Sequence, residues 1–356
     1  MFNKISFVSD EVEKILEDKK KPSGGTVSFL SRIKYALFLS FKEKEIFVFA
    51  LLQWISVGVG YLLWVQMLDW IPEEVWRSTR DSNSGSIVDW VLIIWSFICI
   101  GVAAFPIGIL SGCMGAAHFL HKQGKESTIA SCFKLVLPQI RCLWSFHWAD
   151  GWITVMQIVE RIPSKESFKF SKRARSELLY YAWKLGVVGV LPSILLGNGL
   201  IKSGKNSIIF VKDNFIEVAK LRGGYSALCW ILGILSYLGS VIFIKEFEII
   251  SSNTEIYGQI YRIYLWLALP IIMSAGILML VLRPIYIISL CDLYSDHLSN
   301  KGEEIQLPDN PSKSISTLVA FGCFCIFIVV LYLYRNELGI VDMLSTPYGQ
   351  EYKPKE

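Results

Sequence analysis

The sequence predicts an all-α integral membrane protein: a polytopic helical bundle with two parallel-oriented structural repeats and amphipathic surface helices. Three observations lead to this fold class. Apolar residues make up 53% of the 356-residue chain. The charged residues cluster between the apolar blocks, and several blocks reach the roughly 20 residues that cross a bilayer. A soluble domain of this length would interrupt its apolar runs sooner.

The distribution of charge predicts how the chain is oriented. The formal net charge is only +4, and nine Lys and Arg residues lie within the first 45 positions. The loops at 69–86 and 246–263 are acidic or nearly free of Lys and Arg. The positive-inside tendency therefore places the N-terminus in the cytoplasm, and these loops and the C-terminus outside. We expect a multi-pass protein of the bacterial inner membrane and no nucleic-acid partner.

The first half of the chain begins with a polar, cytoplasmic tail over 1–30 and an amphipathic stretch over 31–44. An apolar block then predicts a span over 46–68. A second block predicts a span over 87–118, which is long enough to tilt or to extend beyond the bilayer. Pro106 predicts a kink within that second span.

The second half follows a linker over 179–208, which contains the apolar run 182–201. A basic amphipathic stretch over 209–222 comes next. We expect three further strong spans and then a polar C-terminal tail, at 224–245, 264–292, 314–334 and 336–356 respectively.

Two segments of the chain match without gaps at an offset of 178 residues. Residues 106–126 and 284–304 share eight identities in 21 positions. The same offset carries the first amphipathic stretch and the first span onto their counterparts in the second half. It also carries 136–157 onto the last span. We therefore predict two membrane repeats, over 31–178 and 209–335, related by an axis along the membrane normal.

The segment 136–159 has marginal hydropathy and two interpretations. On a helix, three tryptophans share one face and a narrow polar stripe occupies the other. The stripe suits a helix that crosses with its polar edge inside the bundle, in which case 182–201 crosses back and the protein has seven spans. Alternatively the helix lies flat with its tryptophans in the headgroups, and five spans remain. These tryptophans are Trp144, Trp148 and Trp152, and the stripe is Gln139, His147, Asp150, Thr154 and Gln157.

Arg283 is the most unusual charge in the predicted spans, because it lies late in a span and just before Pro284. Its guanidinium either reaches the cytoplasmic surface or pairs with Asp150 inside the bundle. The set of intramembrane polar candidates is therefore His147, Asp150, Thr154, Gln157 and Arg283.

Three small residues, Gly108, Gly112 and Ala116, recur at four-residue spacing in the second span. On a helix they form one face without bulky side chains, which lets another helix approach closely. We expect this face to be a helix-packing surface.

Three of the four histidines are candidate metal ligands. His118 and His121 are one helical turn apart, and His297 lies one position from the repeat equivalent of His118. A divalent metal or haem site between the repeats is one interpretation, and ordinary interfacial histidines are the other. No Cys-x-x-Cys pair, hydrolase elbow or zinc-protease helix is present. We therefore expect no cofactor and no catalytic residue.

The order of elements over 180–305 carries a resemblance. A proline-bearing apolar run, VGVLPSILL, leads to a basic amphipathic helix, and a later span ends in LCDLYSDHLSNKGEE. This order resembles uncharacterised multi-span bacterial membrane proteins similar to the membrane domain attached to glycerophosphodiester phosphodiesterases. The resemblance implies an inner-membrane bundle, often an accessory or scaffold, and carries over no catalytic residue. The chain departs from that pattern at 295–297 and 301–303, and shows no hydrolase domain.

These observations predict a non-enzymatic structural or accessory subunit of a bacterial inner-membrane complex. Its expected partners are membrane lipids and other membrane proteins. The parallel repeats and the polar stripe support an alternative, a small-solute transporter or channel. The basic surface helices and the resemblance support a second alternative, a lipid-binding or lipid-modifying membrane protein.

Overall fold

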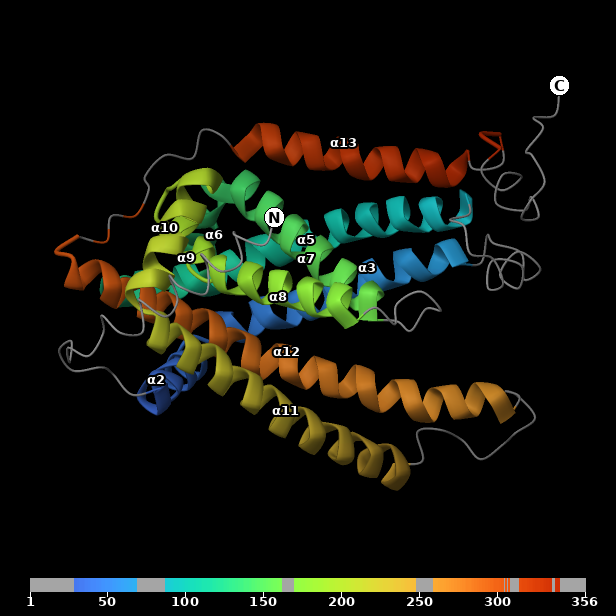
Figure 1. The fold of residues 1–356 in the computed structure, drawn as a ribbon, viewed down its shortest axis with the longest axis horizontal. Helices are drawn as coiled ribbons and strands as arrows, with labels where there is room; N and C mark the ends of the chain where they lie inside the picture. The colour runs from blue at the N-terminus through green and yellow to red at the C-terminus, as the bar shows by residue number, and fades with distance from the viewer. Residues whose placement is uncertain are drawn as a thin grey trace.

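The computed structural model describes residues 29–68, 87–161, 170–247, 259–303, 305, 307, 314–334 and 337–339. Every regular element within these residues is a helix, which confirms the predicted all-α class. The long helices lie roughly along the longest axis, and the short helices gather toward one end, here called the short-helix end (Figure 1). The short helices are α2 (Phe29–Lys42), α6 (Ile129–Val136), α9 (Val190–Leu195) and α10 (Leu200–Asp213).

The first two long helices, α3 (Glu45–Leu68) and α5 (Ile87–Lys122), pack against each other. The α3 sequence is apolar on nearly every side, as expected of a helix without a solvated face. Its Gln53 is fully buried and faces α5, where its amide donates to the Ile107 carbonyl at 3.1 Å and to Ser111 Oγ at 2.7 Å. The predicted second span ends one turn later than expected, at Lys122.

The C-terminal ends of α5 and α12 (Gln259–Asn300) are closed in the same way. Gly124 and Gly302 follow these helices with φ of 70° and 73°. The next amide in each case donates back to a helix carbonyl, Lys125 to Leu120 and Glu303 to Leu298. Such a bond caps the C-terminus of a helix when the preceding residue adopts the left-handed conformation, which favours glycine. The two glycines are 178 residues apart, which is the offset of the sequence repeat.

Residues 129–161 form α6, a short 3-10 turn over 137–139, and α7 (Ile140–Arg161). The side chain of Thr128 caps α6 by accepting from the Ser131 amide at 3.2 Å. Helix α7 lies along α5, where the indoles of Trp144 and Trp148 donate to backbone carbonyls at 2.9 Å each. Its tryptophan face therefore contacts a helix, whereas the flat interpretation places that face among lipid headgroups.

The apolar run 182–201 is divided between three helices. Helix α8 (Phe170–Gly186) begins before the run, the chain turns, and α9 and α10 follow. Ser207 of α10 holds this turn together, because its hydroxyl accepts from the Gly189 amide at 2.8 Å and donates to the Gly186 carbonyl at 2.6 Å. The predicted ends of the linker, at 179 and 208, fall inside α8 and α10.

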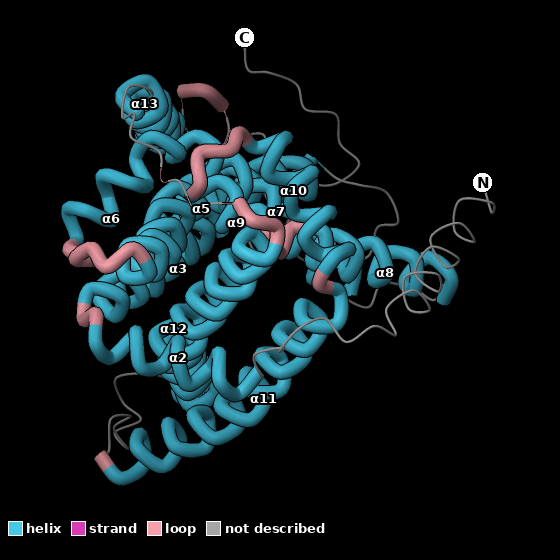
Figure 2. The backbone as a smooth tube through the Cα atoms, turned by 90° about the vertical axis from the view of Figure 1, so that its left-hand side faces the viewer, coloured by secondary structure: helices cyan, strands magenta, loops and turns pink. Residues whose placement is uncertain are grey.

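The remaining long helices are α11 (Phe215–Glu246), which packs against α12, and α13 (Ser314–Leu333). The predicted surface stretch 209–222 divides between the end of α10 and the start of α11, so its last residues belong to a long apolar helix. Phe321 of α13 stacks on Phe105 of α5 with ring centroids 3.6 Å apart. An end-on view shows α13 and α11 at opposite edges of the bundle (Figure 2).

Five helical stretches among the described residues are long and apolar enough to cross a membrane: 45–66, 92–122, 177–195, 215–246 and 266–300. Helix α7 is more polar and is not among them. Helix α13 contributes a shorter apolar stretch, 316–331. Within the described residues, the largest of three buried hydrophobic clusters joins both halves of the chain, since it includes Phe49, Met114, Ile194 and Ile288.

Candidate functional site

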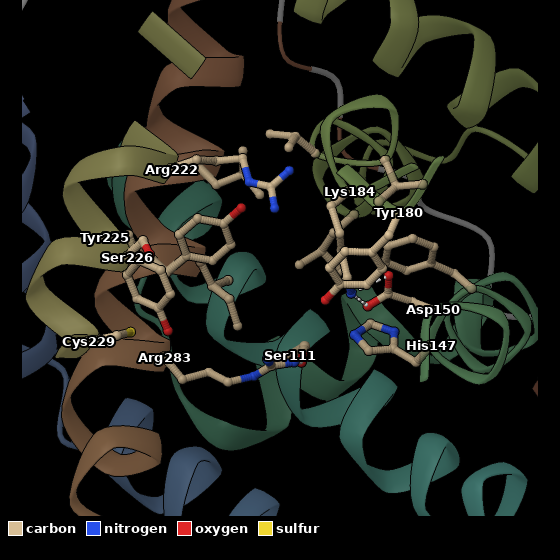
Figure 3. A pocket seen from close by; sticks show the side chains of 17 residues that line it. Ser111, His147, Asp150, Tyr180, Lys184, Arg222, Tyr225, Ser226, Cys229 and Arg283 are labelled. Carbon is tan, nitrogen blue, oxygen red and sulfur yellow. Dashed lines mark hydrogen bonds and ion pairs between the residues drawn. The ribbon is translucent and has the colours of Figure 1, made fainter. Parts of the chain in front are cut away.

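A cavity of about 380 Å³ lies among the long helices, within the size range of ligand sites. Helices α7 and α8 form one wall and α11 and α12 form the opposite wall, with Ser111 of α5 between them (Figure 3). The polar side chains that line it are Ser111, His147, Asp150, Tyr180, Lys184, Arg222, Tyr225, Ser226, Arg283 and Tyr286. Residues from both halves of the chain therefore build one site.

The first wall holds an ion pair. His147 and Asp150 are one turn apart on α7, so both side chains point to the same side of the helix. Lys184, in the last turn of α8, lies 2.7 Å from both carboxylate oxygens of Asp150. Trp183 donates its indole N–H to the same carboxylate at 3.1 Å. The negative charge of Asp150 is therefore compensated within the wall, and both partners are largely buried.

The second wall carries two guanidinium groups. Arg283 of α12 donates to Gln53 Oε1 at 3.1 Å and to Ser111 Oγ at 3.4 Å, both of which are neutral acceptors. Arg222 of α11 points into the open space of the cavity (Figure 3). Neither guanidinium has a carboxylate within ion-pair distance among the residues that the structure describes.

Of the two interpretations of Arg283, the ion pair with Asp150 is wrong. Both residues line the cavity, but Asp150 is paired with Lys184 and Arg283 is bonded to Gln53 and Ser111. The alternative, in which Arg283 reaches the surface, does not describe its contacts either. The buried amide of Gln53 and the buried hydroxyl of Ser111 accept hydrogen bonds from Arg283, and they stabilise its charge without neutralising it.

The charge balance determines what the cavity can bind. Three cationic side chains line it, Lys184, Arg222 and Arg283, against the single carboxylate of Asp150. A guanidinium presents several N–H donors in one plane and matches the oxygens of a carboxylate or a phosphate. Three tyrosines and two serines add hydroxyl donors around the same space. The cavity thus has the chemistry of an anion site.

The polar stripe of α7 reaches the cavity only in part. His147 and Asp150 line it, whereas Thr154 and Gln157 do not. The hydroxyl of Thr154 donates to the Asp150 carbonyl within α7 at 2.7 Å, and Gln157 is buried.

The small-residue face of α5 lies against α7. A Cβ at Gly108 would lie 3.0 Å from the Leu143 carbonyl oxygen and 3.3 Å from His147 Nδ1. One at Gly112 would meet Leu143 at 3.0 Å, and Ala116 is fully buried. The close approach positions His147 and Asp150 toward the cavity.

The candidate metal ligands lie in separate surroundings. His118 Nδ1 is 3.3 Å from the Tyr35 hydroxyl, and His121 is 3.4 Å from Glu43. His297 Nδ1 is 2.7 Å from Asn214. No group of three His, Cys, Asp or Glu residues in the described part of the chain could hold a metal ion.

A second charged group, the α2–α12 charge cluster, lies near the short-helix end. It consists of Arg32, Lys122, Asp292 and Asp296. Arg32 is buried and bonds to both carboxylates, at 2.7 Å for Asp296. Lys122 lies 3.4 Å and 3.3 Å from the same two carboxylates. Each cation therefore faces two anions, and the cluster joins α2 and α5 to α12.

The sequence analysis missed two important residues: Arg222, which lines the cavity, and Gln53, which accepts a hydrogen bond from the cavity residue Arg283. The sequence pattern places Arg222 in a basic surface helix. It does not single out Gln53, which is one polar residue in an apolar span. A signal for Arg222 exists, because the apolar pattern of 224–245 extends backward without a proline that would end the helix. Gln53 could not be found this way, since its importance depends on which helix packs beside it.

No protein-family model, no curated protein and no solved structure matches this chain. The resemblance of 180–305 to the membrane domain attached to glycerophosphodiester phosphodiesterases therefore stays a prediction.

Proposed function

We propose that this chain is a multi-pass membrane protein that binds a small anion or an anionic headgroup in the cavity between α7, α8, α11 and α12. One observation carries the proposal: Arg222 and Arg283 face the cavity without a carboxylate partner in the described chain, while Asp150 is already paired with Lys184. Uncompensated charge among apolar helices is costly and marks functional sites. A bound phosphate or carboxylate would offset that cost.

The five long apolar stretches support the membrane assignment. We extend it to seven spans, because α7 lies along α5 and donates two indole N–H groups to it. In this arrangement the short-helix end is cytoplasmic, the N-terminus lies inside and the C-terminus outside. The basic character of the first 45 residues favours this orientation.

Two contacts support the proposed repeat. His118 contacts Tyr35, and His297 contacts Asn214, and in both cases the partners are 83 residues apart in sequence. Each pair joins a short helix or its end to the last turns of a long one. Together with the matching glycine caps at 124 and 302, these contacts favour two halves with parallel orientation. The cavity then lies between elements of both halves.

The predicted role as a structural or accessory subunit stays a prediction. A scaffold needs apolar helix faces, and this chain has them. A scaffold does not need two guanidinium groups that face a cavity. Small-solute transport is a second candidate, favoured by the position of the cavity between the two halves. Anion binding is the step that transport and lipid binding would share, so it is tested first.

The test uses the full chain in nanodiscs of zwitterionic lipid, with glycerol 3-phosphate as the probe. We expect glycerol 3-phosphate to raise the unfolding temperature of the wild-type protein in a saturable way. The double variant Arg222→Gln/Arg283→Gln should bind at least about 100-fold more weakly, since hydrogen bonds to charged groups contribute roughly 1.5–3 kcal/mol each.

The matched control is Lys202→Gln/Lys205→Gln. It removes two positive charges from exposed positions on α10, outside the cavity. We expect this variant to bind as the wild type does. Equal binding by the wild type and by the Arg222/Arg283 double variant, or no stabilisation of the wild type at all, would overturn the proposed function.

A further inference from the structure

An apolar hollow of about 390 Å³ lies on the other side of the α7–α8 wall. Helices α7, α8, α9 and α10 surround it. Its lining is almost entirely hydrocarbon and includes Phe146, Ala149, Ala182, Trp183, Val187 and Ile208. No charged side chain lines it, in contrast to the cavity. Its volume is close to that of the cavity.

The hollow and the cavity share part of their walls. Phe146 and Val187 line both of them. The neighbouring residues Trp183 and Lys184 face different sides: Trp183 lines the hollow, while Lys184 lines the cavity. The two sides are also joined by the hydrogen bond from the Trp183 indole to the Asp150 carboxylate. A cationic, anion-binding site and an apolar site therefore adjoin each other, separated by the side chains that line both.

We propose that the ligand is an anionic phospholipid. Its phosphate ester lies between Arg222 and Arg283, and one of its acyl chains extends past Phe146 and Val187, the residues common to both linings, into the apolar hollow. The inference rests on the anion-binding function proposed above and adds the substrate class. Charge complementarity selects the phosphate, and the adjoining hydrocarbon surface selects a ligand that carries a chain. A free phosphate would use only the cavity.

The test is photo-crosslinking with phosphatidic acid that carries a diazirine on an acyl chain. The full chain is placed in nanodiscs of phosphatidylcholine with a small fraction of this probe, irradiated and mapped by peptide mass spectrometry. We expect adducts on the residues of α7, α8 and α10 that line the hollow. Unlabelled phosphatidic acid should compete with labelling, and added phosphatidylcholine should not.

Two glycine variants separate the hollow from the bilayer-facing surface. A Cβ at Gly204, which lines the hollow, or at Gly239 of α11 would meet no atom within 4 Å, so both positions accept a side chain. Gly204→Leu fills the hollow and should reduce the adducts about tenfold. Gly239→Leu should leave them unchanged. Arg283→Gln should also reduce them, because the headgroup loses a partner.

The outcomes distinguish this inference from the proposed function. If the adducts fall only on the exposed face of α11, or if Gly204→Leu has no effect on their yield, the phospholipid is not the ligand. The proposed anion site still stands in that case, provided that glycerol 3-phosphate stabilises the same nanodisc preparation. If glycerol 3-phosphate fails to bind, the proposed function itself is wrong.

Discussion

The α2–α12 charge cluster and the cavity contain similar residue types in opposite balance. In the cluster, two cations face two carboxylates, and every charge has an opposite partner within 4 Å. In the cavity, three cations face one carboxylate. A balanced group of charges neutralises itself and holds helices together. The excess positive charge of an unbalanced group is neutralised only by an anion that is not part of the described chain.

The difference has an energetic consequence. Moving a charge out of water costs several kcal/mol, and a nearby opposite charge returns much of that cost. Removing one member of a balanced cluster therefore strands its partners. Removing Arg222 or Arg283 from the unbalanced cavity strands no carboxylate, so the main effect falls on the ligand. Variants in the charge cluster should therefore change mainly the free energy of unfolding, and variants of Arg222 or Arg283 should change mainly the affinity for the ligand.

The largest expected effect is on stability, in the balanced cluster. Arg32→Gln leaves Asp292 and Asp296 with Lys122 as their remaining cation. The free energy of unfolding should fall by about 3 kcal/mol, since the side chain of Arg32 is only 7% exposed. Thermal and denaturant unfolding in nanodiscs would measure this change.

The control for that variant is Lys34→Gln, which removes an exposed cation from the same helix. We expect it to change the free energy of unfolding by less than about 0.5 kcal/mol. The double variant Arg32→Gln/Asp292→Asn should recover part of the loss, because it also removes one stranded carboxylate. Equal effects of Arg32→Gln and Lys34→Gln would show that the cluster does not stabilise the fold.

A smaller effect is expected on affinity, in the cavity. Asp150→Asn removes the carboxylate that holds Lys184 and repels an anion, while the amide oxygen still accepts hydrogen bonds. Affinity for glycerol 3-phosphate should rise about tenfold. Isothermal titration in nanodiscs would measure it. The matched control is Asp213→Asn, which removes a carboxylate paired with Lys301 outside the cavity. An unchanged affinity in Asp150→Asn would contradict the assignment of Lys184 to the anion site.

The sequence predicted the helical elements well and their tertiary partners poorly. Long apolar blocks specify helices through composition alone, so the bounds of α3 and α13 differ from the predicted ones by one residue, whereas α11 begins nine residues earlier than predicted and α12 ends eight residues later. The offset of 178 also aligns Gly124 with Gly302, the two glycines that follow α5 and α12 with positive φ. These features depend on residues that are near one another in the chain.

The site depended on contacts that no local pattern contains. Arg283 and Asp150 are both among the predicted intramembrane polar candidates, and both line the cavity. Their pairing was wrong because Lys184 lies closer to Asp150, and that position follows from the turn between α8 and α9. The break in 182–201 is set by Ser207 reaching back to Gly186 and Gly189. A hydropathy pattern carries no information about such a bond.

The smallest expected effect is a pH dependence of stability at Tyr35, which lies near the carboxylates of the balanced cluster. Burial, as the larger cause, and the nearby carboxylates of Asp292 and Asp296 together raise the pKa of Tyr35 from 10.0 to about 12. The folded state therefore favours the neutral phenol, which lies 3.3 Å from His118 Nδ1. The unfolded phenol ionises first, near its ordinary pKa. The stabilising contribution is complete below pH 10 and is lost as the pH rises toward 12.

The variant Tyr35→Phe isolates this contribution, because other groups also titrate in the same range and their effects cancel in the difference. The free energy of unfolding of the wild type should fall more steeply between pH 10 and pH 12 than that of Tyr35→Phe. Denaturant unfolding at intervals across this range gives both slopes. Parallel slopes would mean that the phenol ionises equally in both states, and that the two carboxylates of the α2–α12 charge cluster do not act on it.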